Sequence, residues 1–195
     1  MKVLAINGSP RKDGNTAMLL RTVLAEIEAA GIETELVQLH GKELHGCTGC
    51  MQCWKKKDGH CAITKDGLNE LLEKIWSAKG LLIGSPTFFA DVTSNVNSLI
   101  DRVGMVAMAN DGALARKLGA AVVAVRRGGA IHVFDSINHF FGISQMLVVG
   151  SSYWNIGRGL EPGDVAQDEE GLLTMKNLGK NMAWALGKLY GEDAS

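Results

Sequence analysis

The chain has 195 residues, 46% of them apolar and 21% charged, so it is long enough for one domain with a buried core and is not expected to be disordered. Its 20 Lys and Arg residues nearly balance 21 Asp and Glu residues, which argues against a nucleic-acid-binding protein. No apolar run approaches the roughly 18 residues that span a bilayer, and the N-terminus lacks the apolar stretch of a signal peptide. We therefore expect a cytoplasmic protein that binds neither nucleic acid nor membranes.

Short apolar runs alternate along the chain with longer segments whose apolar residues recur at helical spacing. The short runs predict strands and the longer segments predict helices. In chain order, strands are predicted at 2–7, 34–39, 81–84, 120–125 and 147–149, and helices at 16–30, 67–78, around 96–103, at 131–145 and around 175–189.

The predicted strands are apolar throughout, without the alternation of a sheet that has one wet face. This favours a parallel sheet covered by helices on both faces. We expect a flavodoxin-like α/β three-layer sandwich with five parallel strands in the order 2-1-3-4-5, formed by one domain over 1–195. In such sheets ligands bind at the carboxyl ends of the strands, so the loops at 8–16, 85–93 and 126–131 are the predicted site.

The nine residues GSPRKDGNT (8–16) join the first predicted strand directly to a helix. A turn of this kind directs backbone N–H groups and the positive end of the helix at one point, and Ser9 and Thr16 add hydroxyl groups there. Arg11 is close enough in sequence to add positive charge. The loop therefore predicts an anion site.

The spacing separates this loop from the common dinucleotide and nucleotide motifs. Five residues separate Gly8 from Gly14, and Asn15 stands where a P-loop has its Lys. Because the G-x-G-x-x-G fingerprint is also absent, the pattern favours a single terminal monophosphate. The alternative is a glycine-rich turn in which Asn15 or Thr16 only caps the helix.

The segment KVLAINGSPRKDGNT (2–16) resembles the beginning of the NADPH-dependent FMN reductases, which belong to the flavodoxin-like superfamily. In that family the loop holds the phosphate of FMN. The resemblance therefore implies FMN as the cofactor. It also implies phosphate contacts from the matching residues here, which are Ser9, Arg11, Gly14, Asn15 and Thr16.

Two further loops extend the resemblance. SPTFFADVTSNVNSLIDR (85–102) is similar to the family's loop after the third strand, which implies that the isoalloxazine ring lies along Pro86, Thr87, Phe88 and Phe89. A flat, partly apolar ring favours aromatic walls, although both Phe residues have a core position as the alternative.

RRGGAIH (126–132) matches the third flavin-contacting loop in position and glycine content only. It implies flavin contacts from Arg127 and Gly128. Arg126, Arg127 and His132 would stabilise a reduced, anionic flavin, with ordinary surface charge as the alternative. GRGLEPG (157–163) lacks the spacing of a glycine fingerprint and is interpreted as a surface loop.

All four cysteines lie within an insert at about 44–66, in the pattern C-x2-C-x2-C-x7-C. Zinc ribbons and fingers use two separated ligand pairs, whereas three cysteines at this continuous spacing surround one compact object, as in iron–sulfur proteins. The set Cys47, Cys50, Cys53 and Cys61 therefore predicts one [4Fe–4S] cluster. A zinc site and free thiols are the alternatives, and disulfides are not expected in a cytoplasm.

The compact cysteine motif resembles the iron–sulfur flavoproteins of the same superfamily, so the resemblance covers nearly the whole chain. It implies an FMN-dependent NAD(P)H oxidoreductase in which a reduced nicotinamide, bound transiently, passes electrons through flavin and cluster to a quinone, small-molecule or ferredoxin-type acceptor. No catalytic side chain is implied, because the flavin carries the chemistry. A homodimer or homotetramer is also implied. The alternative function is a non-enzymatic electron carrier that accepts electrons from ferredoxin.

Overall fold

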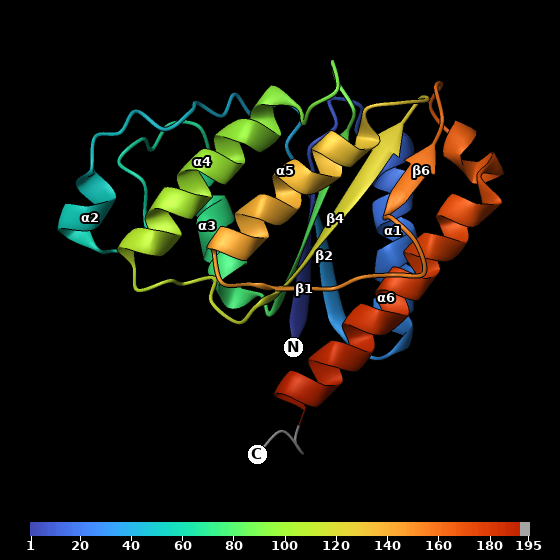
Figure 1. The fold of residues 1–195 in the computed structure, drawn as a ribbon. Coiled ribbons are helices and arrows are strands. Elements are labelled where there is room, and N and C mark those ends of the chain that lie inside the picture. Colours follow the sequence, from blue (N-terminus) through green and yellow to red (C-terminus); the bar gives the residue numbers. More distant parts are fainter. Residues whose placement is uncertain (192–195) are drawn as a thin grey trace.

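The computed structural model describes residues 1–191 and shows a parallel sheet between two layers of helices (Figure 1). The strands are β1 (Lys2–Asn7), β2 (Glu33–Gln38), β3 (Gly80–Pro86), β4 (Leu118–Val125), β5 (Leu147–Val148) and β6 (Ile156–Arg158). The helices are α1 (Asn15–Ala29), α2 (Gln52–Lys56), α3 (Leu68–Ser77), α4 (Ser94–Ala109), α5 (Ala130–Ile143) and α6 (Glu169–Tyr190), with a 3-10 turn, η1 (Asp164–Gln167).

The sheet has the strand order β2-β1-β3-β4-β5 with parallel pairing throughout, which confirms the predicted fold class. The carboxyl ends of β1, β3 and β4 therefore meet at one edge, the upper edge in Figure 1. The order reverses between β1 and β3, and a parallel sheet offers its ligand crevice at such a point.

The outer position beside β4 is shared by two short strands. β5 pairs with the beginning of β4, at Leu118 and Gly119, and β6 pairs with its end, from Val123 to Val125. The strand predicted at 147–149 is therefore only the first part of this edge. β6 is too short for its apolar pattern to stand out from a loop.

Apolar side chains fill both faces of the sheet, as the strand composition predicts. Every residue of β4 is buried, and successive side chains along the strand point to opposite faces of the sheet. Ala120 and Val122 pack in the layer of α1 and α6, whereas Ala121 and Val123 pack in the layer of α3, α4 and α5. Within residues 1–191, no helix is long and apolar enough to cross a membrane.

Candidate functional site

The loop after β1 is attached to the end of β3 through the backbone. The amide of Gly8 donates to the carbonyl of Gly84 at 2.8 Å. A Cβ on Gly8 would lie 2.1 Å from Cγ2 of Val96 and 2.9 Å from the Gly84 oxygen, so only glycine permits this approach. The Thr93 hydroxyl donates to the Gly8 carbonyl at 2.9 Å. Two of the three predicted cofactor loops are thus fixed to each other.

The beginning of α1 has no side-chain cap. Its N-cap residue is Gly14, and no side chain accepts a hydrogen bond from the first turn. The alternative in which Asn15 or Thr16 only caps the helix is therefore wrong. Because the first N–H groups of a helix have no partners within the helix, this end of α1 offers donors and positive potential to an anion.

A cavity of about 190 Å³ lies at this edge of the sheet. It brings together residues from all three predicted loops and from the segment after β6. Its lining consists of Ser9, Arg11, Asn15, Thr16, Pro86, Thr87, Phe88, Ala124, Arg126, Gly159 and Leu160.

One polar atom in this lining is buried without a partner. The hydroxyl oxygen of Thr87 is shielded from solvent and makes no hydrogen bond within the described chain. Buried polar atoms are almost always hydrogen-bonded, and an exception calls for an explanation. A ligand that fills the cavity with polar groups supplies one, so the residues fit a bound cofactor of this kind.

Four of the predicted flavin contacts lie elsewhere. Gly14 is outside the cavity lining, at the N-cap of α1. Phe89 has a positive φ of 48° and a fully exposed side chain. Arg127 and Gly128 line a neighbouring cavity of about 370 Å³. Because Phe88 is also exposed, the core alternative for the two phenylalanines is wrong.

The segment after β6 belongs to the site, which the sequence interpretation as a surface loop did not foresee. The Nδ2 group of Asn15 donates to the carbonyl of Glu161 at 2.9 Å, and its Oδ1 accepts from the amide of Gly163 at 2.9 Å. The side chain of Asn15, a predicted phosphate contact, is thus already bonded to this segment. Gly159 and Leu160 are thereby brought against the cavity.

The four cysteines line a second, smaller cavity beside α4. Its volume is about 20 Å³, and Arg102, Met105 and Val106 contribute to its wall. In the described residues 1–191, no group of three or more His, Cys, Asp or Glu side chains is arranged to hold a metal ion. The predicted ligands are therefore gathered around one space, all as free thiols, without coordination geometry.

Local groups perturb two of these thiols in opposite directions. The backbone amide of Gln52 and the hydroxyl of Thr48 donate to the Cys50 sulfur and lower its pKa below the usual value. Burial raises the pKa of Cys53. Since the thiolate is the form that binds metal, Cys50 reaches the metal-binding form more readily than Cys53 does.

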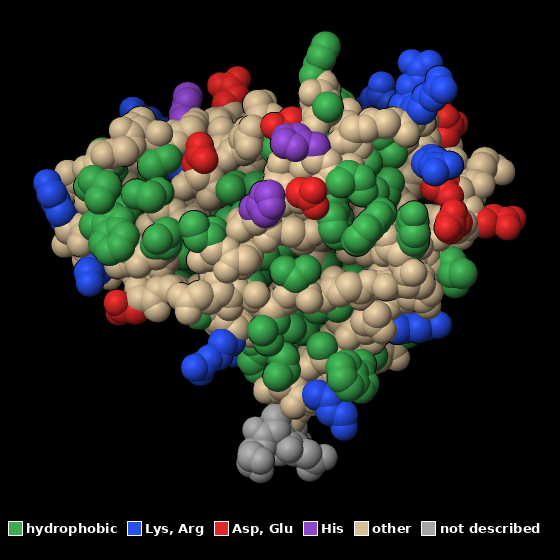
Figure 2. All heavy atoms as spheres, viewed as in Figure 1, with side chains coloured by type: hydrophobic (Ala, Val, Ile, Leu, Met, Phe, Trp, Pro, Cys, Tyr) green, Lys and Arg blue, Asp and Glu red, His purple; other side chains and the backbone are tan. Residues whose placement is uncertain are grey.

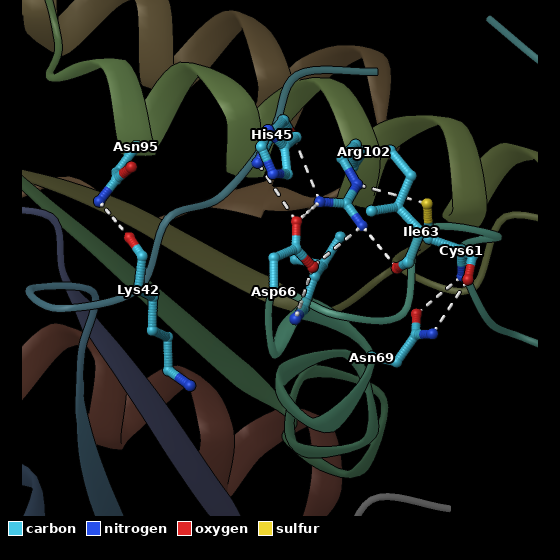
Figure 3. A network of polar contacts seen from close by, with 9 residues as sticks. Lys42, His45, Cys61, Ile63, Asp66, Asn69, Asn95 and Arg102 are labelled. Atoms are coloured by element: carbon cyan, nitrogen blue, oxygen red, sulfur yellow. Dashed lines mark hydrogen bonds and ion pairs between the residues drawn. The ribbon is translucent and has the colours of Figure 1, made fainter. Parts of the chain in front are cut away.

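An arginine that sequence analysis did not single out lies against the cysteine cavity. Arg102 reaches from α4 toward Cys61, Ile63 and Asp66, with His45 close by (Figure 3). The signal was available in the sequence, because this residue interrupts an apolar stripe between Leu99 and Val106. A charge in such a stripe requires a buried partner.

Comparison with known sequences identifies the family to which the chain is similar. The model of a family described as NADPH-dependent FMN reductase matches residues 1–161. A relative named iron-sulfur flavoprotein from Methanocaldococcus jannaschii is 41% identical over 190 residues, which cover 94% of this chain and 96% of the relative. A protein of the same name from Archaeoglobus fulgidus is 38% identical over 192 residues, covering 96% and 92%.

Solved structures resemble the fold at low identity. RosB with a bound 8-demethyl-8-formylriboflavin-5'-phosphate intermediate aligns with a TM-score of 0.73 and 20% identity, covering 98% of this chain and 81% of its own. An archaeal flavodoxin aligns with a TM-score of 0.63 and 16% identity, covering 95% and 99%. These structures show that the fold is flavodoxin-like.

Proposed function

Because the chain belongs to the NADPH-dependent FMN reductase family, we propose that it is an FMN-dependent oxidoreductase that takes electrons from NADH or NADPH. The acceptor would be a quinone, another small molecule or a ferredoxin-type protein. The observation that carries this proposal is the cavity at the carboxyl ends of β1, β3 and β4, with its unpartnered Thr87 hydroxyl.

The phosphate of FMN would bind at the beginning of α1. Ser9 and Thr16 are almost fully buried there and line the cavity with hydroxyl groups, while Arg11 is exposed at its rim. The uncapped N–H groups of the first turn add donors. Asn15 would act through its backbone amide, since its side chain already bonds the segment after β6.

The ring of the flavin would lie toward the loops after β3 and β4. Pro86 at the end of β3 and Thr87 and Phe88 just after it line the cavity, and so does Arg126 from the loop after β4. The sequence offered both Arg126 and Arg127 as charges near the flavin, and we assign this role to Arg126 because it lines this cavity. Arg127 and Gly128 contact the flavin only if the ring extends toward the neighbouring cavity.

Bound FMN would supply hydride acceptance from the nicotinamide and one-electron delivery to the acceptor. The chain positions the ring, excludes water with Pro86 and Phe88 and provides the positive charge of Arg126 near it. Its catalytic contribution is therefore orientation and electrostatics rather than a side chain that reacts.

Cys47, Cys50, Cys53 and Cys61 would hold an iron–sulfur cluster. The support is the donor set itself, since all four thiols face one cavity and none forms a disulfide. Helix α4 joins the two sites. Thr93, at its beginning, bonds the first cofactor loop, and Arg102 lies roughly 14 Å further along its axis beside the cysteines.

A homodimer or homotetramer is also part of the proposal. Apolar side chains gather on the face drawn in Figure 2, which includes parts of α5 and α6. Ile143, Trp154 and Trp184 are large apolar residues with more than half of their surface exposed. Apolar side chains that gather on one face are typical of a surface that another chain covers.

The test begins with the full chain purified without oxygen. We expect FMN to copurify or to be taken up, and NADH or NADPH to be oxidised in the presence of a quinone or ferredoxin. A protein that does not bind FMN would contradict the proposal. If reduced ferredoxin reduces the flavin and neither nicotinamide does, the protein is an electron carrier instead.

The two phenylalanines give a matched pair for the ring position. Phe88 lines the cavity, whereas Phe89 is fully exposed outside it. F88L should weaken FMN binding in a fluorescence titration, and F89L should leave it nearly unchanged. Equal effects would mean that the ring does not lie along the wall described here.

A further inference from the structure

We propose that Arg102 is a positioning residue for the iron–sulfur site: its guanidinium fixes the Cys61 sulfur as a ligand and, by hydrogen-bonding that sulfur, raises the reduction potential of the cluster. The inference rests on the cluster proposed above. It assigns a role to a residue outside the four cysteines.

The guanidinium of Arg102 is completely enclosed. The residue is 1% exposed, which makes it the largest fully buried side chain of the described chain. Burying an arginine is costly unless every donor finds an acceptor. A side chain buried in this way is therefore expected to have an acceptor for each of its five N–H groups.

All five donors are used, and every acceptor belongs to the cysteine-rich insert (Figure 3). Nε donates to the sulfur of Cys61 at 3.3 Å. Nη1 donates to the carbonyl of His45 at 3.2 Å and to Asp66, and Nη2 donates to the carbonyl of Ile63 at 3.0 Å and to Asp66. One side chain thus ties the segment entering the insert to the segment leaving it.

Asp66 orients the arginine rather than competing for it. Its carboxylate accepts from both Nη groups in a fork, so Nε is turned toward the Cys61 sulfur. Burial disfavours the charged carboxyl, but the bonds from Arg102 and from the amides of His45 and Leu68 outweigh it and hold its pKa below the usual value. The pair is therefore ionised at neutral pH.

A buried ion pair is weak evidence for a role in stability, because apolar residues of similar volume often serve as well. Its placement on a predicted ligand is the informative feature. Hydrogen bonds to the sulfurs of an iron–sulfur cluster favour the reduced, more negative state and raise the potential. A charged donor that water cannot reach is the strongest donor available for this purpose.

The other positive charges near the site do not share this geometry. Lys55 and Lys56 lie in α2, and Lys57 follows it, but all three are exposed. Water and salt screen their fields, and the charge of Lys55 is only the smallest of the causes that lower the pKa of Cys50. Lys55 therefore provides a matched control, a nearby cation that bonds no cysteine in the structure.

The experiment compares the full chain, purified without oxygen, with R102Q, R102K and K55Q. Iron and acid-labile sulfide per chain are measured first, and the midpoint potential is then obtained by dithionite titration followed by electron paramagnetic resonance. R102Q should lower the midpoint by about 59 mV or more, a tenfold loss in the relative stability of the reduced state. R102K should fall between wild type and R102Q, and K55Q should stay near wild type.

D66N adds a test of sign. It leaves the guanidinium without its counter-charge, so the midpoint should rise, opposite to R102Q. General loosening of the insert would lower cluster occupancy in both variants without reversing the sign. If R102Q binds no cluster while R102K and D66N retain it, the fixing of Cys61 is supported, and those two variants decide the effect on the potential.

Two results would overturn the inference, and they differ. A wild-type chain without iron and sulfide removes the cluster from the proposed function, and the role of Arg102 falls with it. A fully loaded R102Q with an unchanged midpoint leaves the proposed function intact and refutes only the role of Arg102.

Discussion

The flavin cavity and the cysteine cavity are built by different means. The first lies where strands end, and backbone bonds such as Gly8 to Gly84 and Thr87 to Ala124 fix its walls. The second lies in a long insert with one short helix, and side chains of α4 hold it in place. Asn95 bonds Lys42 just before the insert, Arg102 bonds the insert at four residues, and Asn110, the C-cap residue of α4, bonds Gly59.

The two sites therefore differ in the interactions that determine their shape. Sheet register sets the flavin cavity before any cofactor binds. The insert is held by three polar residues spaced seven and eight positions apart, two of them in α4 and the third at its C-cap. We therefore expect backbone changes to disrupt the first site and side-chain or cofactor changes to disrupt the second.

The largest effect is expected from G8A. The added Cβ would overlap Val96 and the Gly84 carbonyl, so we expect a loss of about 1–3 kcal/mol in the free energy of unfolding and a loss of FMN binding. Urea denaturation measures the first and flavin fluorescence the second. G128A is the control, because a Cβ there would meet nothing within 4 Å. Equal destabilisation by both would show that the close approach of the two loops is unimportant.

C50S should separate the two sites. The variant removes one thiol from the cavity without touching the sheet edge, so iron should be lost while FMN stays bound. Iron analysis and the flavin absorption spectrum give the two readings. Loss of both together would mean that the insert supports the fold of the flavin cavity, contrary to the comparison above.

T87V is expected to act in opposite directions on the empty and the loaded protein. Removing a buried hydroxyl that bonds nothing should leave the free energy of unfolding of the empty protein unchanged or raise it by up to about 1 kcal/mol. FMN affinity should fall by about 1 kcal/mol, roughly fivefold.

T16V should also weaken the binding of FMN, by about 1–3 kcal/mol. Unchanged affinity in both would remove these hydroxyls from the site.

The smallest effect is expected on acidification. The pKa of Asp66 lies below its usual value, so the stability that this carboxylate contributes is present above about pH 4 and is lost as the pH falls through the native pKa. Amide exchange in the insert should therefore rise at acid pH before exchange in β1 and β3 does. In D66N this extra acid sensitivity should disappear. Simultaneous opening of both regions would contradict the comparison.

The apolar strands and the loops that follow them could be predicted from the sequence because parallel strands buried on both faces leave an unbroken apolar run. β4 is such a case, with all its residues buried. The same logic fails for β6, whose three residues pair only because the chain returns to β4 after an interruption. No local pattern encodes that return.

The site residues divide along the same line. The sites of Ser9 and Thr16 could be predicted because both residues belong to the loop that directly follows the first strand. The structure brings them to one cavity. The sequence does not show which of Arg126 and Arg127 points toward the flavin cavity, because this depends on the exact residue at which β4 ends. The break that Arg102 makes in an apolar stripe indicates a buried charge, but its partners, the distant Cys61 and Asp66, are known only from the structure.

The hydroxyl of Thr93 accepts from the amide of Val96 in the first turn of α4 while it donates to the carbonyl of Gly8. One hydroxyl thus holds the helix end and the first loop together, so we expect local opening of one segment to favour opening of the other.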